Sequence, residues 1–391
     1  MFKTIRSLPR TVWLIGFISL VNDTASEMLY PLMPLYLASV LMAGPKALGI
    51  IEGIAEASSS IFKLISGVIV DRTKKAKPWI VLGYTLASFG RPLIAIANSW
   101  VWVLAIRFTD RMGKGMRSSP RDALLAESVS ESQRGITFGL HRSMDNAGAV
   151  IGPLLAALFL SMGVPLKDIF LWAIVPGVIT ITLALCIKEP PREVGPQASR
   201  FSWSLDGMPK QFKRYLVVAG IFALGNSSDM FLLLRARDAG VPLEQIPLLW
   251  AAISLITTLF GTPLSALSDT FGRKRFILIA WLAFAFFYIM MGLPGLSIYQ
   301  IFALFGVYGL FKAATEGVEK ALVADMAPKG LAGTAFGWFN LITGLMLFPA
   351  SLIFGWVYES IAPMYAFIFS GGCALVAFVL MAIWVTRAKE I

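Results

Sequence analysis

The sequence predicts an all-α integral membrane protein in which twelve transmembrane helices form two pseudo-symmetric six-helix bundles. Composition is the first reason: 57% of the residues are hydrophobic and the mean hydropathy is +0.73, outside the range of soluble globular domains. The second reason is a series of apolar runs, each long enough to cross a hydrocarbon layer about 30 Å thick as a helix. The third is an internal repeat with a separation of 198 residues.

Twelve apolar runs follow one another along the chain. They cover residues 11–40, 47–70, 78–97, 100–125, 136–161, 166–187, 214–236, 244–268, 275–294, 297–324, 332–357 and 361–386. Several exceed the roughly 20 residues that a perpendicular span needs, which leaves room for tilt. A linker rich in charge and proline separates the halves. The predicted domains are therefore an N-terminal bundle at 1–187, a cytoplasmic linker at 188–213 and a C-terminal bundle at 214–391.

The repeat relates two pairs of segments. Asp71 before a basic run matches Asp269 before a second basic run, and the segment 121–127 matches the segment 319–325. In membrane transporters, duplicated halves of this kind place a binding site between bundles that rock against each other. The repeat therefore favours transport by alternating access.

Basic residues indicate the orientation of the helices in the membrane. Those on one predicted side are Lys3, Arg6, Arg10, Arg72, Lys74, Lys75, Lys77, Lys188, Arg192, Arg200, Lys210, Lys213, Arg214, Arg273, Lys274 and Arg275. By the positive-inside rule, both termini and the linker are expected in the cytoplasm, and the protein in the cell inner (plasma) membrane. The net charge of +11 follows mostly from this bias, so binding to nucleic acid is not expected.

The sequence carries no catalytic motif. It has no phosphate-binding Gly-x-x-x-x-Gly-Lys-Ser/Thr loop, so ATP is not expected to drive the protein directly. Cys186 and Cys373 lie in different predicted helices, and the single histidine, His141, has no clustered metal ligands and is interpreted as a structural donor. The chain is not expected to be an enzyme or to bind a metal or cofactor. Its energy is expected to come from a proton gradient.

The fourth predicted helix holds the densest group of charges within the membrane. Its five cations are Arg107, Arg111, Lys114, Arg117 and Arg121. Their spacings of four, three, three and four residues put them in one sector of a helix that turns by 100° per residue. A charge near the bilayer centre costs at least ~2.5 kcal/mol, so this face is expected to meet a water-filled cavity or paired carboxylates.

Carboxylates on other helices are the candidate partners. Asp23 and Glu27 share a face of the first helix at i, i+4, and we interpret them as the proton-coupling pair, whose proton affinity would change as their surroundings alternate. We interpret Glu52, Arg91 and Arg142 as structural charges, which balance the charges around the fourth helix and lock the N-terminal half together. In the second half, Asn226 and Asp229 are the counterpart of Asn22 and Asp23, and the tenth helix carries Lys312 and Glu316. The predicted cavity residues are Asn22, Tyr30, Glu56, Arg107, Asp110, Arg111, Lys114, Arg117, Asp145, Asn226, Asp229, Lys312 and Glu316.

Three local patterns match those of a known family. The loop between the second and third helices has Gly67, Asp71, Arg72 and Lys75, with Lys74 in place of a second glycine. The loop between the eighth and ninth helices has Asp269, Gly272 and Arg273, with Ser265 in place of the first glycine. The fifth helix has Gly139, Gly148, Gly152 and Pro153, followed by Ala156 and Ala157 in place of a glycine pair. On these residues the chain resembles transporters of the major facilitator superfamily over its whole length.

The resemblance implies a cavity and a gate. In that family the first, fourth, seventh and tenth helices line the central cavity, which agrees with the distribution of charge in this chain. The fifth-helix pattern is similar to an antiporter motif, in which Gly148 and Gly152 allow close packing and Pro153 permits a bend. The loop signature implies that Asp71, at the cytoplasmic end of the second helix, latches the halves in the outward-open state.

Taken together, these patterns favour a proton-coupled secondary active transporter that exports a small organic solute by antiport. A rival interpretation is an importer or exchanger of an anionic solute, such as a carboxylate, phosphate ester or siderophore, bound by the cationic fourth helix. A third, of another class, is a membrane sensor or scaffold that transports nothing. The expected partners are a small-molecule substrate and the lipid bilayer, and we expect a monomer.

Overall fold

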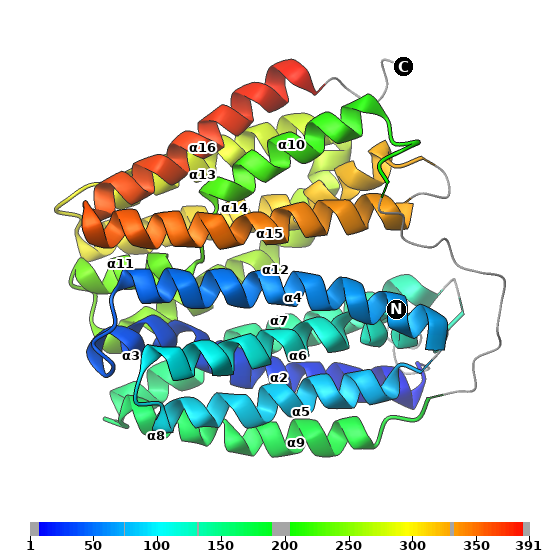
Figure 1. The fold of residues 1–391 in the computed structure, drawn as a ribbon, viewed down its shortest axis with the longest axis horizontal. Helices are drawn as coiled ribbons and strands as arrows, with labels where there is room; N and C mark the ends of the chain where they lie inside the picture. The colour runs from blue at the N-terminus through cyan, green and yellow to red at the C-terminus, as the bar shows by residue number, and fades with distance from the viewer. Residues whose placement is uncertain (1–7, 74, 131–132, 190–203, 329–331, 386–391) are drawn as a thin grey trace. The chain divides into compact units, whose positions relative to one another are not determined.

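The computed structural model describes residues 8–73, 75–130, 133–189, 204–328 and 332–385. Within these ranges, only the backbone is described at positions 68, 71–73, 134, 135, 269, 316, 332 and 333. The regular elements within these ranges are all helices (Figure 1). They are α2 (Arg10–Leu29), η1 (Tyr30–Leu32), α3 (Met33–Ser39), α4 (Pro45–Thr73), α5 (Lys77–Leu93), η2 (Ile94–Ile96), α6 (Trp100–Glu127), α7 (Arg134–Ser161), α8 (Leu166–Trp172), α9 (Ile174–Leu185), α10 (Lys210–Gly225), α11 (Met230–Asp238), η4 (Leu243–Gln245), α12 (Ile246–Phe271), α13 (Arg273–Gly292), α14 (Ile298–Met326), α15 (Ala332–Ser360) and α16 (Pro363–Trp384).

Nine stretches of the described residues are long and apolar enough to cross a membrane. They are Lys77–Ile96, Ile136–Ser161, Leu166–Leu185, Lys210–Asp238, Leu243–Ser268, Arg273–Gly292, Ile298–Met326, Thr334–Ser360 and Pro363–Trp384. The three other predicted runs coincide with α2 and α3, with α4 and with α6, whose charged residues lower their hydropathy. The predicted all-helical membrane fold is confirmed, and each of the twelve predicted runs contains helix.

Three of the runs that were predicted as continuous helices are interrupted in the structure. In the first, Pro31 and Pro34 lack the backbone N–H that a helix needs, and η1 separates α2 from α3. In the sixth, Pro176 cannot donate to the helix, and α8 ends at Trp172. In the seventh, α10 ends where Asn226 leaves helical geometry with φ −94° and ψ 74°. Just after this break, the Ser228 hydroxyl accepts a hydrogen bond from the backbone N–H of Met230 at 3.3 Å, an alternative to a bond within a continuous helix.

The described chain forms two compact units. The described residues within Met1–Met42, Ser58–Ala198 and Leu243–Ala251 form unit 1, and those within Ala43–Ala57, Ser199–Pro242 and Ala252–Ile391 form unit 2. In unit 1, α2 packs on α7 and α9, and α5 packs on α6 and α9 (Figure 1). In unit 2, α13 packs on α14 and α16, and α10 packs on α15 and α16. The predicted division at 188–213 stays a prediction.

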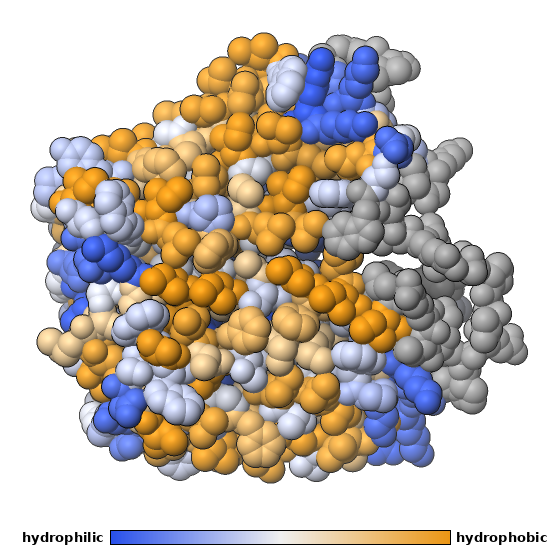
Figure 2. Space-filling model, in the orientation of Figure 1, coloured by the Kyte–Doolittle hydropathy of each residue, from blue (hydrophilic) through white to orange (hydrophobic). Residues whose placement is uncertain are grey.

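Both units present apolar side chains outward. Figure 2 shows hydrophobic residues over the middle of the visible helices in each unit and hydrophilic residues mainly toward the helix ends. Exposed examples are Val175, Val178 and Ile179 on α9 and Leu375, Val376 and Val379 on α16. Apolar exposure on this scale is expected of surfaces that face lipid.

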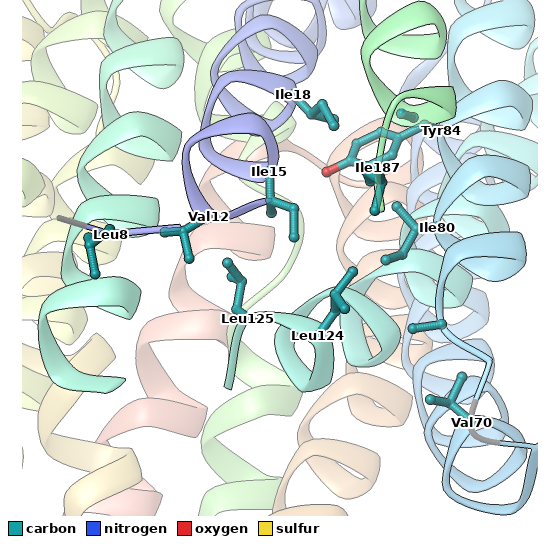
Figure 3. Packing of buried hydrophobic residues seen from close by; sticks show 12 residues of the cluster. Leu8, Val12, Ile15, Ile18, Val70, Ile80, Tyr84, Leu124, Leu125 and Ile187 are labelled. Carbon is teal, nitrogen blue, oxygen red and sulfur yellow. The ribbon is translucent and has the colours of Figure 1, made fainter. Parts of the chain in front are cut away.

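Each unit also has its own interior cluster. In unit 1 the cluster comprises Leu8, Val12, Ile15, Ile18, Val70, Ala76, Ile80, Tyr84, Leu124, Leu125, Ala184 and Ile187, all at most 5% exposed (Figure 3). In unit 2 the cluster is aromatic, with ring centroids 4.2 Å apart for Phe284 and Tyr288 and 4.5 Å apart for Phe222 and Trp281. These cores hold the helices that carry the polar residues described below.

Two helix starts are fixed by specific contacts. The carboxylate of Glu189 accepts hydrogen bonds from the backbone N–H groups of Ala76, at 2.6 Å, and Lys77, at 3.1 Å. Such first-turn donors have no partner within a helix, and a negative charge is favourable at this end. At the start of α13, Gly272 has φ +91°, a conformation that side-chain-bearing residues rarely adopt. The second loop signature therefore needs its glycine for the turn itself.

Candidate functional site

The charged residues of α6 lie opposite its apolar exposed face. Val101 and Phe108 are exposed, and at 100° per residue they point roughly the other way from the cations at 107–121. Of those cations, Arg107, Arg111 and Arg117 are buried, whereas Lys114 is exposed within the charged sector. The helix therefore turns its apolar side outward and its charges toward other polar groups of unit 1.

Asp110 is the centre of a buried ion-pair group in unit 1. Arg91 Nε donates to Asp110 Oδ1 at 3.0 Å, and Arg107 Nη1 lies 3.6 Å from Asp110 Oδ2. Arg91 Nη1 also donates to the backbone oxygen and to Oδ1 of Asn22, both at 3.1 Å. These contacts join α2, α5 and α6. They support the interpretation of Arg91 as a neutralising charge.

A small cavity adjoins this group. It is lined by Ser26, Leu29, Tyr30, Met33, Arg91, Ile94, Ile106, Arg107 and Asp110. Its volume is about 10 Å³, whereas small-molecule sites typically measure ~300 Å³ or more. In this conformation the cavity is too small for an organic solute.

Asp23 and Glu27 face the cations of α6. The charged neighbours of Asp23 are Asp145, Arg117, Lys114 and Arg121. Both carboxylates are half-buried. The predicted pair on α2 is thus brought together with the predicted cationic sector, and with Asp145 on α7.

The two carboxylates have different hydrogen-bond donors. Asn22 Nδ2 donates to Asp23 Oδ1 at 2.8 Å, within the same helix. Trp250 Nε1, on the first turns of α12, donates to Glu27 Oε2 at 2.7 Å. The charged neighbours of Glu27 are Asp23, Lys114 and Arg111.

Arg117 and Arg121 continue the charged sector along α6. The Arg117 guanidinium lies over the Tyr84 ring, 4.6 Å from its centroid. Arg121 donates from Nε and Nη2 to Asp122 Oδ1, at 3.1 and 3.0 Å, and from Nη1 to Ser19 Oγ at 3.4 Å. A cation over an aromatic face and a paired carboxylate both compensate for loss of water.

His141 lies at the junction of α2 and α7. Its Nε2 is 2.8 Å from Ser19 Oγ and 3.7 Å from Asp145 Oδ1. The residue is 5% exposed. Ser19, Asp23 and Glu27 follow one another at i, i+4 and i+8 on α2, so one row of polar side chains runs along the α2–α7 contact.

Unit 2 has a second polar group, at the break between α10 and α11. Lys312 Nζ donates to Asp229 Oδ2 at 2.6 Å, and the Tyr308 hydroxyl donates to Asp229 Oδ1. Ser228 Oγ donates to Glu52 Oε2 at 3.2 Å, and both residues belong to unit 2. The structure therefore pairs Asp229 with Lys312, two of the predicted cavity residues.

The remaining predicted cavity residues lie at the end of α10 and on α4, α14 and η1. Asn226 is half-buried at the end of α10, where its backbone N–H bonds Phe222 and Ala223. Glu56 is half-buried on α4, within the segment that belongs to unit 2. The side chain of Glu316 lies outside the described residues. Tyr30, at the start of η1, stacks on Trp250 with ring centroids 4.7 Å apart.

The fifth-helix glycines lie where α7 meets α2. A Cβ added at Gly152 would fall 2.6 Å from the backbone nitrogen of Met28, and one at Gly148 would fall 2.6 Å from the backbone oxygen of Leu20. No real Cβ tolerates such distances, so both glycines are required for this close approach. Pro153 is buried within α7, which continues through it.

The loop signatures are described only in part. The side chains of Asp71, Arg72 and Asp269 lie outside the described residues. Gly67 lies beside Ser119 of α6, at a distance that would accept a Cβ, and Lys75 is exposed. Arg273 Nη1 contacts Asp325 Oδ2 and the backbone oxygen of Ala321, both at 2.6 Å. The second signature therefore fastens the start of α13 to the end of α14.

Several residues that contact the charged side chains of unit 1 are not among the site residues predicted from the sequence. Ser19 was detectable, because it precedes Asp23 by one helical turn. Tyr84 and Trp250 gave no signal, because a neutral aromatic residue within an apolar run is indistinguishable from core. Among the described residues, no cluster of three His, Cys, Asp or Glu side chains is placed to hold a metal.

Comparison with known families agrees with this arrangement. The sequence model of the Major Facilitator Superfamily matches residues 15–235 and 215–390. The chain belongs to this superfamily. It is thus a multi-pass membrane transporter of a family that carries small molecules and is not enzymatic, and the resemblance given by the loop and helix patterns is confirmed.

Relatives of the chain match it over lengths from about a third to nearly all of its residues. An uncharacterised MFS-type transporter of Methanocaldococcus jannaschii is 32% identical over 389 residues, covering 96% of this chain and 95% of the relative. The multidrug resistance protein MdtH of Photorhabdus laumondii is 31% identical over 133 residues, 34% of this chain and 32% of that protein. The crystal structure of the nucleoside transporter NupG has a TM-score of 0.82 at 13% identity, covering 96% of this chain and all of that one, and it supports the fold alone.

Proposed function

We propose that this transporter is a proton-coupled antiporter that exports a small organic solute across the cell inner (plasma) membrane by alternating access. The observation that carries the proposal is the position of Asp23 and Glu27, two half-buried carboxylates among the cations of α6. A carboxylate in such a place binds or releases a proton when its surroundings change between water, cations and packed apolar groups. Alternating access supplies that change.

Charge balance supports a neutral or cationic solute. We call the following residues the unit 1 polar cluster: Asn22, Asp23, Glu27, Arg91, Arg107, Asp110, Arg111, Lys114, Arg117, Arg121, Asp122 and Asp145. It holds six cations against five carboxylates. A net charge of only +1 leaves little net attraction for an anion, and the ionised carboxylates of Asp23 and Glu27 are the groups that would hold a cation. Protonation of Asp23 or Glu27 then makes it more positive, which favours release of a cation.

The α2–α7 contact supports antiport. Gly148 and Gly152 allow α7 to pack closely on the segment of α2 that carries Asp23 and Glu27. A movement of either helix therefore changes the surroundings of both carboxylates. The relative MdtH, named a multidrug resistance protein, matches a third of the chain. The proposal includes the gate at Asp71, cytoplasmic termini and a monomeric protein that needs no cofactor beyond the proton gradient.

One observation favours the rival, an importer or exchanger of an anionic solute. Lys114 is exposed within the charged sector of α6, and Arg111 is close to Glu27. An exposed ammonium beside a guanidinium can bind a carboxylate or phosphate group directly. The rival predicts that such anions, rather than cations, compete with the substrate.

Flux into proteoliposomes tests these alternatives. Purified protein is reconstituted with an imposed pH gradient, and a panel of cationic, neutral and anionic solutes is followed with the gradient in each direction. Accumulation of a cationic or neutral solute on the more acidic side, opposite in direction to the flow of protons, supports the proposal. Accumulation of anions supports the rival, and no flux across the panel favours a sensor or scaffold.

A further inference from the structure

The hydrogen bond between Trp250 and Glu27 links a candidate proton site to a second helix. Both residues belong to unit 1. Trp250 Nε1 lies 2.7 Å from Glu27 Oε2, and the indole is only 7% exposed. An indole N–H only donates hydrogen bonds. In this contact the Glu27 oxygen is therefore the acceptor.

Packing holds both partners in place. The indole stacks on Tyr30 with centroids 4.7 Å apart and planes 28° apart. Tyr30 begins η1, where Pro31 breaks the helix, so the ring sits at a fixed corner of the chain. On the other side, Gly152 allows α7 to touch the backbone of α2 at Glu27. The indole ring and the backbone at Glu27 are thus both held by packing.

Other charged groups surround Glu27 without replacing this donor. Asp23 lies one turn earlier on α2, Lys114 and Arg111 approach from α6, and Asp145 of α7 faces Asp23. Asp23 receives its hydrogen bond from Asn22 on its own helix. Of the two carboxylates, Glu27 is the one whose hydrogen bond comes from another helix.

A charged acceptor changes the strength of this bond. Hydrogen bonds to an ionised carboxylate are roughly twice as strong as those between neutral groups. The indole therefore favours the charged form of Glu27, and the bond weakens when Glu27 takes up a proton. The start of α12 is then held less firmly to α2.

We propose that Trp250 is the positioning residue of the proton site, because its N–H donates to the Glu27 carboxylate, stabilises its charged form and ties α2 to the first turns of α12 until Glu27 is protonated. This inference rests on the proposed function for the role of Glu27. The hydrogen bond itself makes a chemical prediction that does not depend on transport.

Chemical labelling of Glu27 tests the inference. Dicyclohexylcarbodiimide modifies protonated carboxyl groups within membranes, and peptide mass spectrometry gives the pH at which half of Glu27 is labelled in the reconstituted protein. Trp250→Phe keeps a ring on Tyr30 but removes the N–H. We expect its half-labelling pH to rise by about one unit, a tenfold change in proton affinity. Incorporation of 3-benzothienylalanine at position 250, which replaces the N–H by sulfur in a ring of the same shape, should give the same shift.

Trp281→Phe is the matched control. Trp281 Nε1 donates to Glu319 Oε1 at 3.3 Å in unit 2, so the variant removes the same kind of donor from a different carboxylate. It should leave the half-labelling pH of Glu27 at the wild-type value. An unchanged value in both position-250 variants, or an equal shift in the control, would overturn the inference. Failure of proton-driven flux together with the expected labelling shift would instead refute the proposed function and leave the role of the indole standing.

Discussion

Arg91 and Asp110 form an ion pair that is almost fully withdrawn from solvent, with Nε and Oδ1 3.0 Å apart and side chains 7% and 5% exposed. From the sequence, Asp110 is predicted to line the substrate cavity and Arg91 to be a structural, neutralising charge. Their pairing, together with Arg107, supports a structural role for both. Removal of one partner of a buried pair leaves an uncompensated charge, which typically costs ~3–5 kcal/mol.

Asp110→Asn should therefore destabilise the protein strongly, by about 3 kcal/mol or more. Thermal unfolding of the detergent-purified protein measures the effect. Asp122→Asn is the control on the same helix, because Asp122 is 44% exposed beside Arg121 and exposed pairs contribute only ~0–1 kcal/mol. Equal losses in the two variants would contradict a structural role specific to Asp110.

Glu27→Gln and Asp23→Asn should each abolish gradient-driven transport while expression stays near normal. Both amides keep the size of the side chain and remove the group that binds the proton. Flux in proteoliposomes over a range of pH is the measurement, with Glu244→Gln as the control, since Glu244 is exposed in η4. Wild-type pH dependence in both cluster variants would remove the pair from the mechanism.

The charged face of α6 was predictable because a helix fixes the angle between successive residues. The spacing from Arg107 to Arg121 therefore determined one sector before any neighbour was known. That Asp23 and Glu27 lie beside the cations of α6 was predictable from the free-energy cost of a charge in a membrane, because this cost falls when opposite charges meet.

The pairing within the site was not predictable. Nothing in the spacing shows that Arg91 selects Asp110 or that Trp250 reaches Glu27, because these contacts depend on which helices pack together. The break at Asn226 was also missed. Its polar residues were recognised as functional candidates, but a mean hydropathy over the run still favours a continuous helix.

Arg111→Lys should have a mild effect on transport, about threefold or less in apparent substrate affinity. Lysine keeps the charge near Glu27 and Asp110 but not the two-pronged geometry that holds a carboxylate or phosphate. Concentration dependence of flux, with organic cations and anions as competitors, gives the answer. A sharp loss of affinity together with competition by anions would favour the anion transporter instead.

Arg273→Ala should loosen the end of α14 more than Asp325→Asn does. Arg273 Nη1 binds both the Asp325 carboxylate and the Ala321 carbonyl, so the asparagine variant loses one charge whereas the alanine variant loses both contacts. The side chains are 26% and 47% exposed, so the pair contributes only ~0–1 kcal/mol. Maleimide modification of Ala324→Cys, in a background without Cys186 and Cys373, should accelerate about two- to fivefold in Arg273→Ala. Equal rates in the two variants would show that the carbonyl contact adds nothing.

Gly152→Ala should impair both stability and transport, because the added methyl group has no room. Its Cβ would fall 2.5 Å from the Thr24 oxygen and 2.6 Å from the Met28 nitrogen, and backbone atoms cannot rotate away as a flexible side chain can. The α2–α7 pair must separate, at a cost of about 1–3 kcal/mol. Thermal unfolding and proton-driven flux should both fall.

Gly139→Ala separates this effect from a general sensitivity of α7 to substitution. Gly139 lies on the same helix, and a Cβ there would meet nothing within 4 Å. Alanine in that open position should leave transport unchanged and stabilise the helix by about 0.5–1 kcal/mol. Because Gly152 touches the backbone of the very turn that carries Glu27, its variant should also alter the pH dependence of any remaining flux, whereas Gly139→Ala should not. Loss of stability at position 152 with an unaltered pH profile would mean that the close contact holds the helices together without setting the position of the proton site.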